Sequence, residues 1–367
     1  MRSLFLLVLI VLIGSLSFSQ GSISGSHIVA TYSIVAWDSA TGDLGVAVQS
    51  RFLGVGAVVP FAKAGVGAIA TQAYANTSFG PRGLDLLTQG MSAQQVGAML
   101  LQGDTDAAQR QVAIVDARGG VYAYTGTGCQ QYAGQITGSG YSAQGNILAG
   151  ENVTKAMARM YEITPGDLAD RLLAALDAGE SAGGDKRGRQ SAALLVVRAH
   201  GGYGGYNDRY IDIRVDDDSL PLVKLRHIYE LWQSAFLMDA RMRTIDEFNK
   251  AGNFRAARVE MERVVSSFNN ELRLKPDDPD VLNDIAWQLA THDIDKPRAL
   301  ELAKRAAVLA PTRTDILDTM AECHFRLGHY DEAIAIESNL VSKEPANDQY
   351  WKQLQKFKDA KGRSGIH

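Results

Sequence analysis

The chain changes character near its middle, and this change limits it to a two-domain fold. Most of its 36 glycines lie before residue 206, where short apolar runs alternate with turn residues. The remainder is rich in Ala, Leu, Glu, Lys and Arg, which favour helices. The boundary between a strand-and-turn domain and a helical domain is expected between about Asp217 and Glu247. The 367 residues are enough for two such domains, and we assign them to 31–226 and 227–360.

The first residues have the layout of a secretory signal peptide. Arg2 supplies a positive start, the segment 4–13 is an unbroken apolar run, and Ser17 and Ser19 favour cleavage before Gln20. The run is about half of the ~20 residues that a membrane-spanning helix requires. We therefore predict a signal peptide over 1–19, a linker or propeptide over 20–30, and a periplasmic or secreted protein with no integral membrane segment after cleavage.

Strand signals lie at both ends of the first domain, with helical signals between them. The strands are expected at 31–37, 44–50, 65–73, 111–116, 121–125, 191–198 and 210–215, and the helices at 81–89, 93–101 and 150–161, with a fourth capped by Thr164. Ser92 is the expected cap of the second helix, with Gln95 completing a capping box. This order indicates an α+β domain with mainly antiparallel pairing.

Thr31 opens the first convincing strand, behind a removable leader. If the chain were cut before it, its hydroxyl would be a nucleophile and its own α-amine a nearby base. The alternative is structural, because threonine is a common strand residue.

Several other segments carry side chains suited to chemistry. The glycine-rich loop 183–190 holds Asp185 and leads into the strand that begins at Ser191. The segment 71–80 offers the amides of Gln72 and Asn76 as oxyanion donors. Arg51 and Lys63 flank a long apolar stretch, and a buried lysine has a lowered pKa. The structural alternatives are a solvated turn for the loop, a helix cap for the amides, and a lysine that reaches water.

Composition argues against several classes of function. A net charge of −4 gives no reason to expect a nucleic-acid or anionic-membrane surface. The seven histidines are scattered and no cysteine–histidine cluster has zinc spacing. We expect no metal and no cofactor. The acidic run 216–218 is typical of a solvated linker.

Five of these segments together carry a resemblance to a known family. The segments are 31–36, the hairpin 42–48, the GVGAIATQ run at 65–72, Gln144-Gly145-Asn146, and GDKRGRQSAA at 184–193. Over roughly 29–226 they are similar to the domain of unknown function numbered 1028, a bacterial and archaeal family grouped with the N-terminal-nucleophile (Ntn) hydrolases. The resemblance implies a four-layer αββα sandwich with an N-terminal threonine nucleophile, here Thr31.

The resemblance also implies roles for the other candidates. Lys63 would correspond to the lysine that lowers the amine pKa in proteasome-type relatives. The aspartate of those relatives would fall near Gln49, so that partner is missing here. The remaining candidates for the catalytic site are Arg51, Asn76, Asp185 and Ser191. Activity requires removal of every residue upstream of Thr31, because an acylated nitrogen cannot act as a base.

The second domain contains a repeated sequence pattern. Pro276, Pro311 and Pro345 are spaced 35 and 34 residues apart, and each follows an expected helix end. Helices are expected at 281–289, 316–327 and 350–357. The pattern resembles the tetratricopeptide repeat, whose period is 34 residues. Such repeats present surfaces for peptides or proteins, and the alternative is a packing module that contacts the first domain or a second copy in a homodimer.

Two functional hypotheses follow. The first is a periplasmic or secreted amidohydrolase that uses Thr31 on an unidentified amide substrate. The second is a non-catalytic envelope scaffold whose helical repeats bind a partner protein. The position of Thr31 away from the expected signal-cleavage site and the missing aspartate favour the second.

Overall fold

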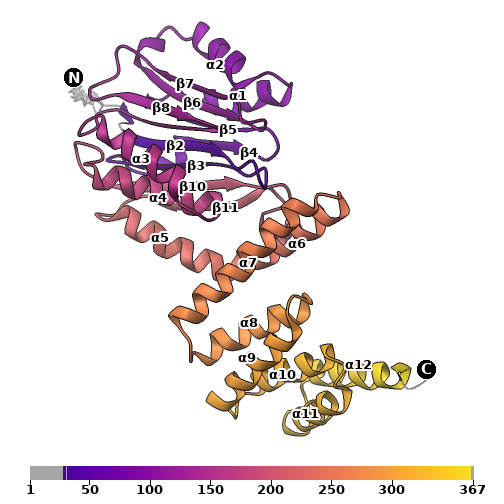
Figure 1. Ribbon diagram of the computed structural model, residues 1–367. Helices are drawn as coiled ribbons and strands as arrows, with labels where there is room; N and C mark the ends of the chain where they lie inside the picture. Colours follow the sequence, from indigo (N-terminus) through magenta and orange to yellow (C-terminus); the bar gives the residue numbers. More distant parts are fainter. Residues whose placement is uncertain (1–27, 30, 365–367) are drawn as a thin grey trace, which may run out of the picture.

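The protein consists of a two-sheet sandwich followed by a chain of helices (Figure 1). The computed structural model describes residues 28–29 and 31–364. The signal-peptide prediction falls outside these residues. No helix in the described part is long and apolar enough to cross a membrane.

Two antiparallel sheets form the sandwich. One has the order β1-β5-β6-β7, with β4 also paired to β5. Its strands are β1 (Ile28–Val29), β4 (Pro60–Lys63), β5 (Gly67–Tyr74), β6 (Arg110–Asp116) and β7 (Val121–Thr125). The other has the order β11-β10-β3-β2-β9-β8. Its strands are β2 (Thr31–Trp37), β3 (Leu44–Ser50), β8 (Gly134–Gly138), β9 (Tyr141–Gly145), β10 (Ser191–Val197) and β11 (Arg209–Val215).

Helices cover the outer face of each sheet. The helices α1 (Phe79–Thr88) and α2 (Ala93–Gln102) pack on β5 and β6 through an apolar cluster that includes Ile69 and Leu100. The helices α3 (Asn152–Ile163), α4 (Leu168–Ser181) and α5 (Pro221–Trp232) cover the other sheet.

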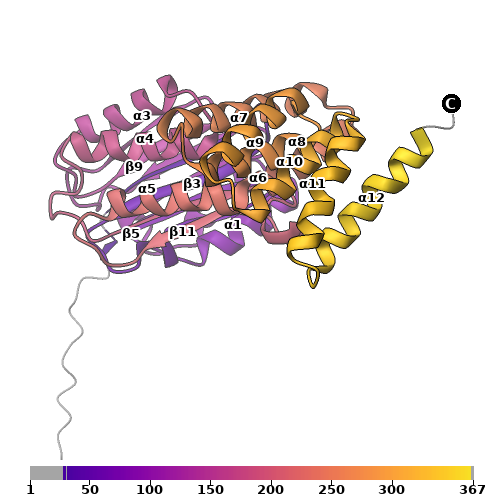
Figure 2. The same cartoon turned by 90° about the horizontal axis from the view of Figure 1, so that it is seen from below.

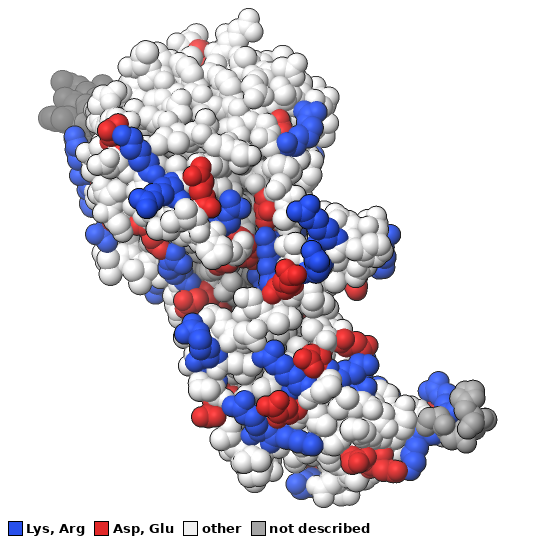
Figure 3. Space-filling model, in the orientation of Figure 1, with Lys and Arg blue, Asp and Glu red and all other residues white. Residues whose placement is uncertain are grey.

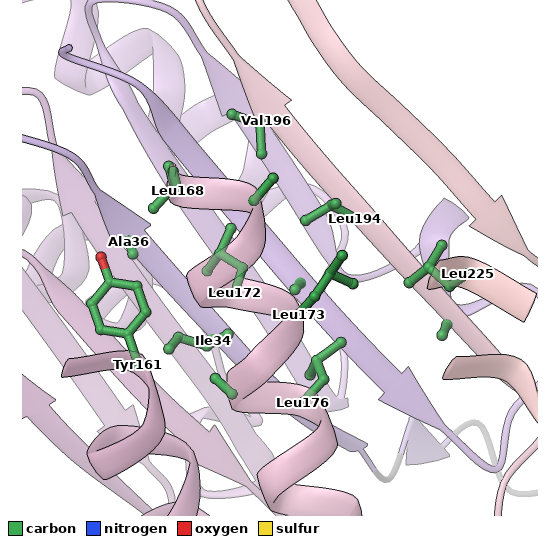
Figure 4. Packing of buried hydrophobic residues seen from close by; sticks show 14 of the residues in the cluster. Ile34, Ala36, Tyr161, Leu168, Leu172, Leu173, Leu176, Leu194, Val196 and Leu225 are labelled. Atoms are coloured by element: carbon green, nitrogen blue, oxygen red, sulfur yellow. The ribbon is translucent and has the colours of Figure 1, made fainter. Parts of the chain in front are cut away.

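Figure 4 shows Leu172, Leu173 and Leu176 of α4 lying against this second sheet. A third cluster, including Val35, Val46 and Ala113, fills the space between the two sheets. The predicted αββα sandwich is therefore confirmed.

The helix caps follow local chemistry, with one correction. Ser92 and Gln95 form the predicted capping box at α2. Thr164, predicted to cap the next helix, instead follows α3, and its hydroxyl donates to the Met160 carbonyl at 2.7 Å. The cap of α4 is Asp167, in a capping box with Asp170. The added turn before α4 explains the difference, because the chain must reverse direction between the antiparallel helices.

The remaining helices pair in succession and extend away from the sandwich (Figure 1). In the view from below, α12 projects beyond the outline of the sandwich (Figure 2). They are α6 (Met238–Lys250), α7 (Phe254–Leu274), α8 (Pro279–Thr291), α9 (Lys296–Leu309), α10 (Thr314–Arg326), α11 (Tyr330–Lys343) and α12 (Asp348–Ser364). The helices α8, α10 and α12 begin about 34 residues apart, which is the tetratricopeptide period. Pro276, Pro311 and Pro345 each come directly after a helix cap, where a residue that cannot continue a helix is favoured.

The helical part attaches to one end of the sandwich. The α5 helix belongs to the sandwich, since Leu222, Leu225 and Tyr229 pack into its core, so the predicted boundary at residue 226 lies inside a helix. Arg263 of α7 binds Asp38 in the turn between β2 and β3, at 2.8 Å. Acidic and basic side chains are mixed over the visible face of the helical part (Figure 3).

A pair of buried carboxyl groups makes the helical part sensitive to pH. Glu337 of α11 is fully buried and Asp318 of α10 nearly so. Burial raises the pKa of Glu337 to about 8, and the neighbouring Asp318 carboxylate adds to this rise. A carboxyl in an unfolded chain titrates near pH ~4.3. The stabilising contribution of the protonated form is therefore complete below that pH and is lost as the pH rises through about 8.

We expect Glu337→Gln to remove this dependence. The variant should match the wild type near pH 4, below the unfolded pKa, and become the more stable of the two at pH 8–9, because glutamine cannot ionise. Thermal unfolding of the helical part across this range measures the effect, and 1 kcal/mol shifts the midpoint of a domain of this size by about 4 °C. Glu332→Gln, an exposed position on the same helix, is the control. Parallel pH profiles for Glu337→Gln and wild type would contradict the prediction.

Candidate functional site

Thr31 is the first residue of β2, and its side chain lies between the two sheets. It is fully buried in this chain. Its Oγ1 donates to the carbonyl oxygen of Val29 at 2.8 Å and lies 3.2 Å from Ser50 Oγ. Ser50 is the last residue of β3 and pairs with Thr31 across the hairpin. The hairpin thus places two hydroxyl groups side by side at the open end of its strands.

A third hydroxyl extends this row. Ser191, the first residue of β10, pairs with Ser50 on the other side of β3. Its hydroxyl donates to the Phe52 carbonyl and accepts from the Val55 amide at 3.1 Å. Because both interactions are made with the backbone of the segment after β3, Ser191 fixes that segment next to Ser50.

A network of buried amides holds the backbone of Thr31. The Thr31 carbonyl accepts from the Asn146 amide at 3.0 Å and from Gln72 Nε2 at 3.4 Å. Gln72 Nε2 also donates to Gln111 Oε1 at 2.8 Å, and Gln72 Oε1 accepts from Ser33 at 2.6 Å. All five residues are fully buried. Asn146 Oδ1 has no hydrogen-bond partner among the described residues. The paired groups of a buried network nevertheless give a fixed geometry, and here they fix the end of β2.

The network also settles the predicted role of Gln72. An amide nitrogen has two protons to donate, and those of Gln72 go to Thr31 and Gln111. Gln72 therefore orients the Thr31 backbone, and its amide protons are already used.

The glycine-rich loop 183–190 is fastened beside Ser50. The Asp185 carboxylate, whose side chain is fully buried, accepts from the Arg51 amide at 3.0 Å and pairs with the Arg187 guanidinium at 2.9 Å. The Gln190 amide donates to the Ser50 carbonyl at 3.0 Å. Gly188 has a φ of 105°, which favours glycine. Asp185 therefore holds the loop and the end of β3 together.

Comparison with known proteins identifies the sandwich. The sequence profile of the family of unknown function DUF1028 matches residues 31–225, a match that begins at Thr31. The chain belongs to the DUF1028 family.

A solved member of the family has a similar structure. The chain is similar to protein SPO2555 from Silicibacter pomeroyi, with 30% identity and a TM-score of 0.53, over 58% of this chain and 91% of that one. No curated protein matches the chain.

Matches to solved helical repeats were also found. One is the Sgt2 TPR domain from Aspergillus fumigatus, with 19% identity and a TM-score of 0.26, over 34% of this chain and 82% of that one. Another is the second TPR domain of human RPAP3, solved with an HSP70 peptide, with 17% identity and a TM-score of 0.25, over 32% and 92% of the two chains.

Two predicted site residues of the DUF1028 domain do not meet Thr31. Lys63 is exposed, at the end of β4, with Nζ 3.3 Å from Thr88 Oγ1 of α1. It pairs with Gly67, at the other end of β5 from Gln72, and five residue steps along a strand span about 17 Å. The reason is topological, because β4 runs antiparallel to β5 and ends far from the network.

Asn76 is the second of these residues. Its Nδ2 donates to Asp104 at 3.0 Å, and its Oδ1 accepts from the Ser78 amide at 3.1 Å. It therefore organises the start of α1, which was the structural alternative.

Sequence analysis did not identify Ser50 as a site residue, because the family resemblance pointed to the neighbouring position 49. Gln49, where the resemblance places an aspartate, pairs with Tyr32. Successive strand residues point to opposite faces, so Gln49 points toward the helical layer while Ser50 points toward Thr31. The sequence did contain this information. In a hairpin whose two strands have equal length, the first residue of the first strand, here Thr31, pairs with the last residue of the second, here Ser50.

Arg51 marks the solvent side of the site. Its side chain is exposed, next to Ser50 in the chain and close to the loop at Gly188. A separate surface groove of about 780 Å³, lined by α3, α4 and Arg226 of α5, lies on the other face of this sheet from Thr31. In the described part of the chain, no group of His, Cys, Asp and Glu has an arrangement that could hold a metal ion.

Proposed function

We propose that the DUF1028 domain of this chain is an amide hydrolase that uses Thr31 as an N-terminal nucleophile. The observation that carries the proposal is the placement of the Thr31 hydroxyl against Ser50, at the point where the family match begins. The buried amides that hold the Thr31 carbonyl support it, because a nucleophile requires a fixed backbone.

The reaction would proceed by acyl transfer. Once Thr31 is the first residue, its α-amine accepts the proton of Oγ1 as that oxygen attacks the carbonyl carbon of an amide. The C–N bond breaks, the proton passes to the departing amine, and the acyl group remains as an ester on Oγ1. Water then cleaves the ester, which releases a carboxylic acid and restores the hydroxyl.

The proposal requires processing before Thr31. The chain as described has Val29 joined upstream and bonded to the Thr31 hydroxyl, so the nitrogen of Thr31 is an amide. We further propose that residues 1–19 direct export and that residues 20–30 are removed as a propeptide in the periplasm or outside the cell.

Processing and activity are expected to coincide. We expect the protein recovered from the cell envelope to begin at Thr31 by intact mass. Two purified forms, one beginning at Gln20 and one released by cleavage of a fusion directly before Thr31, should differ in hydrolysis of acyl anilides. Only the second should be active, since only it has a free amine beside the hydroxyl. A mature protein that begins at Gln20, or equal activity of both forms, would contradict the proposal.

A second function is proposed for the helical repeats, namely binding of a peptide or protein partner. The observation that favours it is their position. They attach at the turn between β2 and β3, through Asp38, seven residue steps or about 23 Å along the chain from Thr31. A partner on the repeats would therefore leave the Thr31 end of the sandwich open. Retention of an envelope protein by the whole chain with Thr31→Ala would test this role separately from hydrolysis.

A further inference from the structure

The residues just upstream of Thr31 are bound like a peptide strand. Strand β1 pairs antiparallel with the end of β5, with Ile28 opposite Tyr74 and Val29 opposite Ala73. On its other edge, Ala73 pairs with Arg110 of β6. The strand β4 covers only Gly67 to Ala70 of β5. The edge of β5 nearest Thr31 is thus occupied by the segment that the proposed function removes.

Val29 makes two further contacts in this position. It is 3% exposed, and its side chain belongs to the apolar cluster between the sheets. Its carbonyl oxygen accepts from Thr31 Oγ1 at 2.8 Å. Backbone pairing, an enclosed apolar side chain and a bond to the nucleophile are the contacts by which extended peptides are recognised at a sheet edge.

Contacts outside β1 hold this edge in shape. Ala73 has a φ of 63°, a conformation that a residue with a Cβ rarely adopts. The Arg110 guanidinium donates to the Tyr74 carbonyl at 2.6 Å and to Asp104 at 2.9 Å. Strained residues persist where the surroundings fix them. Because none of these contacts involves β1, the edge is expected to keep its shape after β1 is removed.

We propose that the mature site binds extended peptides on the edge of β5 left by β1, with a small aliphatic side chain in the place of Val29. This inference rests on the proposed function and names its substrate class. The preferred substrate is a peptide amide cleaved after the residue that directly follows the aliphatic position, as the sequence Ile28-Val29-Ala30 precedes Thr31. A charged side chain is excluded there, because an unpaired charge is costly in an apolar layer.

A measurement of peptide binding to an inactive form tests this proposal separately from catalysis. Acetyl-Ile-Val-Ala is titrated into the form that begins at residue 31 and carries Thr31→Ala, with acetyl-Ile-Asp-Ala and a backbone N-methylated Ile-Val-Ala as controls. We expect the unmodified peptide to bind about tenfold or more tightly than either control. The unprocessed chain should bind it far more weakly, since β1 fills the edge. Equal binding of the Val and Asp peptides, or undiminished binding to the unprocessed chain, would overturn the proposal.

Measurements of hydrolysis then distinguish failure of the peptide-binding proposal from failure of the hydrolase proposal. Acetyl-Ile-Val-Ala anilide should be cleaved by the Thr31 form with a kcat/KM about tenfold or more above that of the Asp peptide. If simple acyl anilides are cleaved without this preference, the peptide proposal fails and the hydrolase stands. If the peptide binds as expected but no amide is cleaved, the hydrolase fails and the peptide site stands.

A variant of the unprocessed chain covers the case in which the shortened chain does not fold. Val29→Asp should release β1 and increase hydrogen exchange at the amide of Ala73 by about tenfold or more, with exchange in β6 unchanged. The Ala73 amide is the informative one because the Thr71 amide, two residues earlier, donates to Val59 on the same edge of β5. The added peptide should then bind and restore protection. Unchanged exchange at the Ala73 amide would overturn the proposal.

Discussion

Replacing Thr31 by alanine in a chain that begins at residue 31 is expected to lower kcat/KM for amide hydrolysis by on the order of 10³-fold or more. The reason is that no other group could form the acyl intermediate in the proposed mechanism. The hydroxyl of Ser191 is already hydrogen-bonded to two backbone groups. Ser50 lies within the chain, so its own nitrogen is an amide and cannot act as a base.

Thr31→Ser should separate the nucleophile from the packing of the side chain. Serine keeps the hydroxyl and the amine but lacks the methyl group that restricts χ1, so we expect reduced but measurable hydrolysis. Thr312→Ala, at an exposed position in the helical part, controls for preparation. Circular dichroism confirms that each variant is folded. Undiminished hydrolysis by Thr31→Ala would contradict the proposed function.

The hairpin that carries Thr31 was predictable from sequence because its two faces are both apolar for most of their length. The expected strands 31–37 and 44–50 are β2 and β3 as observed. The strand β9 was not predicted. Tyr141 and Ala143 point to the helical layer, whereas Ser142 and Gln144 point between the sheets and are buried there by hydrogen bonds. In a sequence, polar residues buried in a hydrogen-bonded network look the same as polar residues that face solvent. The alternation of apolar and polar residues in β9 therefore does not reveal that both faces of the strand are buried.

The candidate site was only partly predictable for the same reason. Thr31, Arg51, Asp185 and Ser191 come together at one end of the sandwich because they lie at strand ends or in a loop that joins them. Lys63 was assigned by its correspondence to a lysine of proteasome-type relatives, and that correspondence says nothing about the direction in which β4 runs here. The amides of Gln111 and Gln144 come from strands that lie far along the chain from Thr31. The packing of the two sheets brings Gln111 to Gln72, and the pairing of β9 with β2 brings Gln144 to Ser33.

The junction between the sandwich and the helices depends on buried charges that pattern analysis could not pair. Arg198 at the end of β10 binds Asp43 at 2.6 Å and Glu260 of α7 at 2.8 Å. Glu260 also lies 3.5 Å from Arg241 and 3.4 Å from Arg263. Burial alone would raise the pKa of Asp167, but the charge of Arg241, a hydrogen bond with Asp170 and the charges of Arg263 and Arg198 together outweigh it and hold that pKa below its usual range.

Glu260→Ala is expected to lower the free energy of unfolding by about 3–5 kcal/mol, because removing one member of a buried ion network leaves the others uncompensated. Glu260 is fully buried and contacts three arginines. Its loss leaves Arg198 and Arg241, whose side chains are 3% and 5% exposed, with fewer counter-charges. We expect α7 to detach from the sandwich before the sandwich unfolds, which denaturant titration followed by tryptophan fluorescence and limited proteolysis would detect.

Glu262→Ala is the matched control, two residues along the same helix. Glu262 is 69% exposed and pairs only weakly with Arg258, at 3.7 Å, and exposed pairs contribute about 0–1 kcal/mol. Its replacement should therefore change stability by less than about 0.5 kcal/mol. Because the Glu260 network lies at the opposite end of β2 from Thr31, Glu260→Ala should also leave the peptide affinity of the Thr31 end unchanged under conditions where the sandwich stays folded. Equal destabilisation by the two variants would mean that the buried network does not hold the domains together.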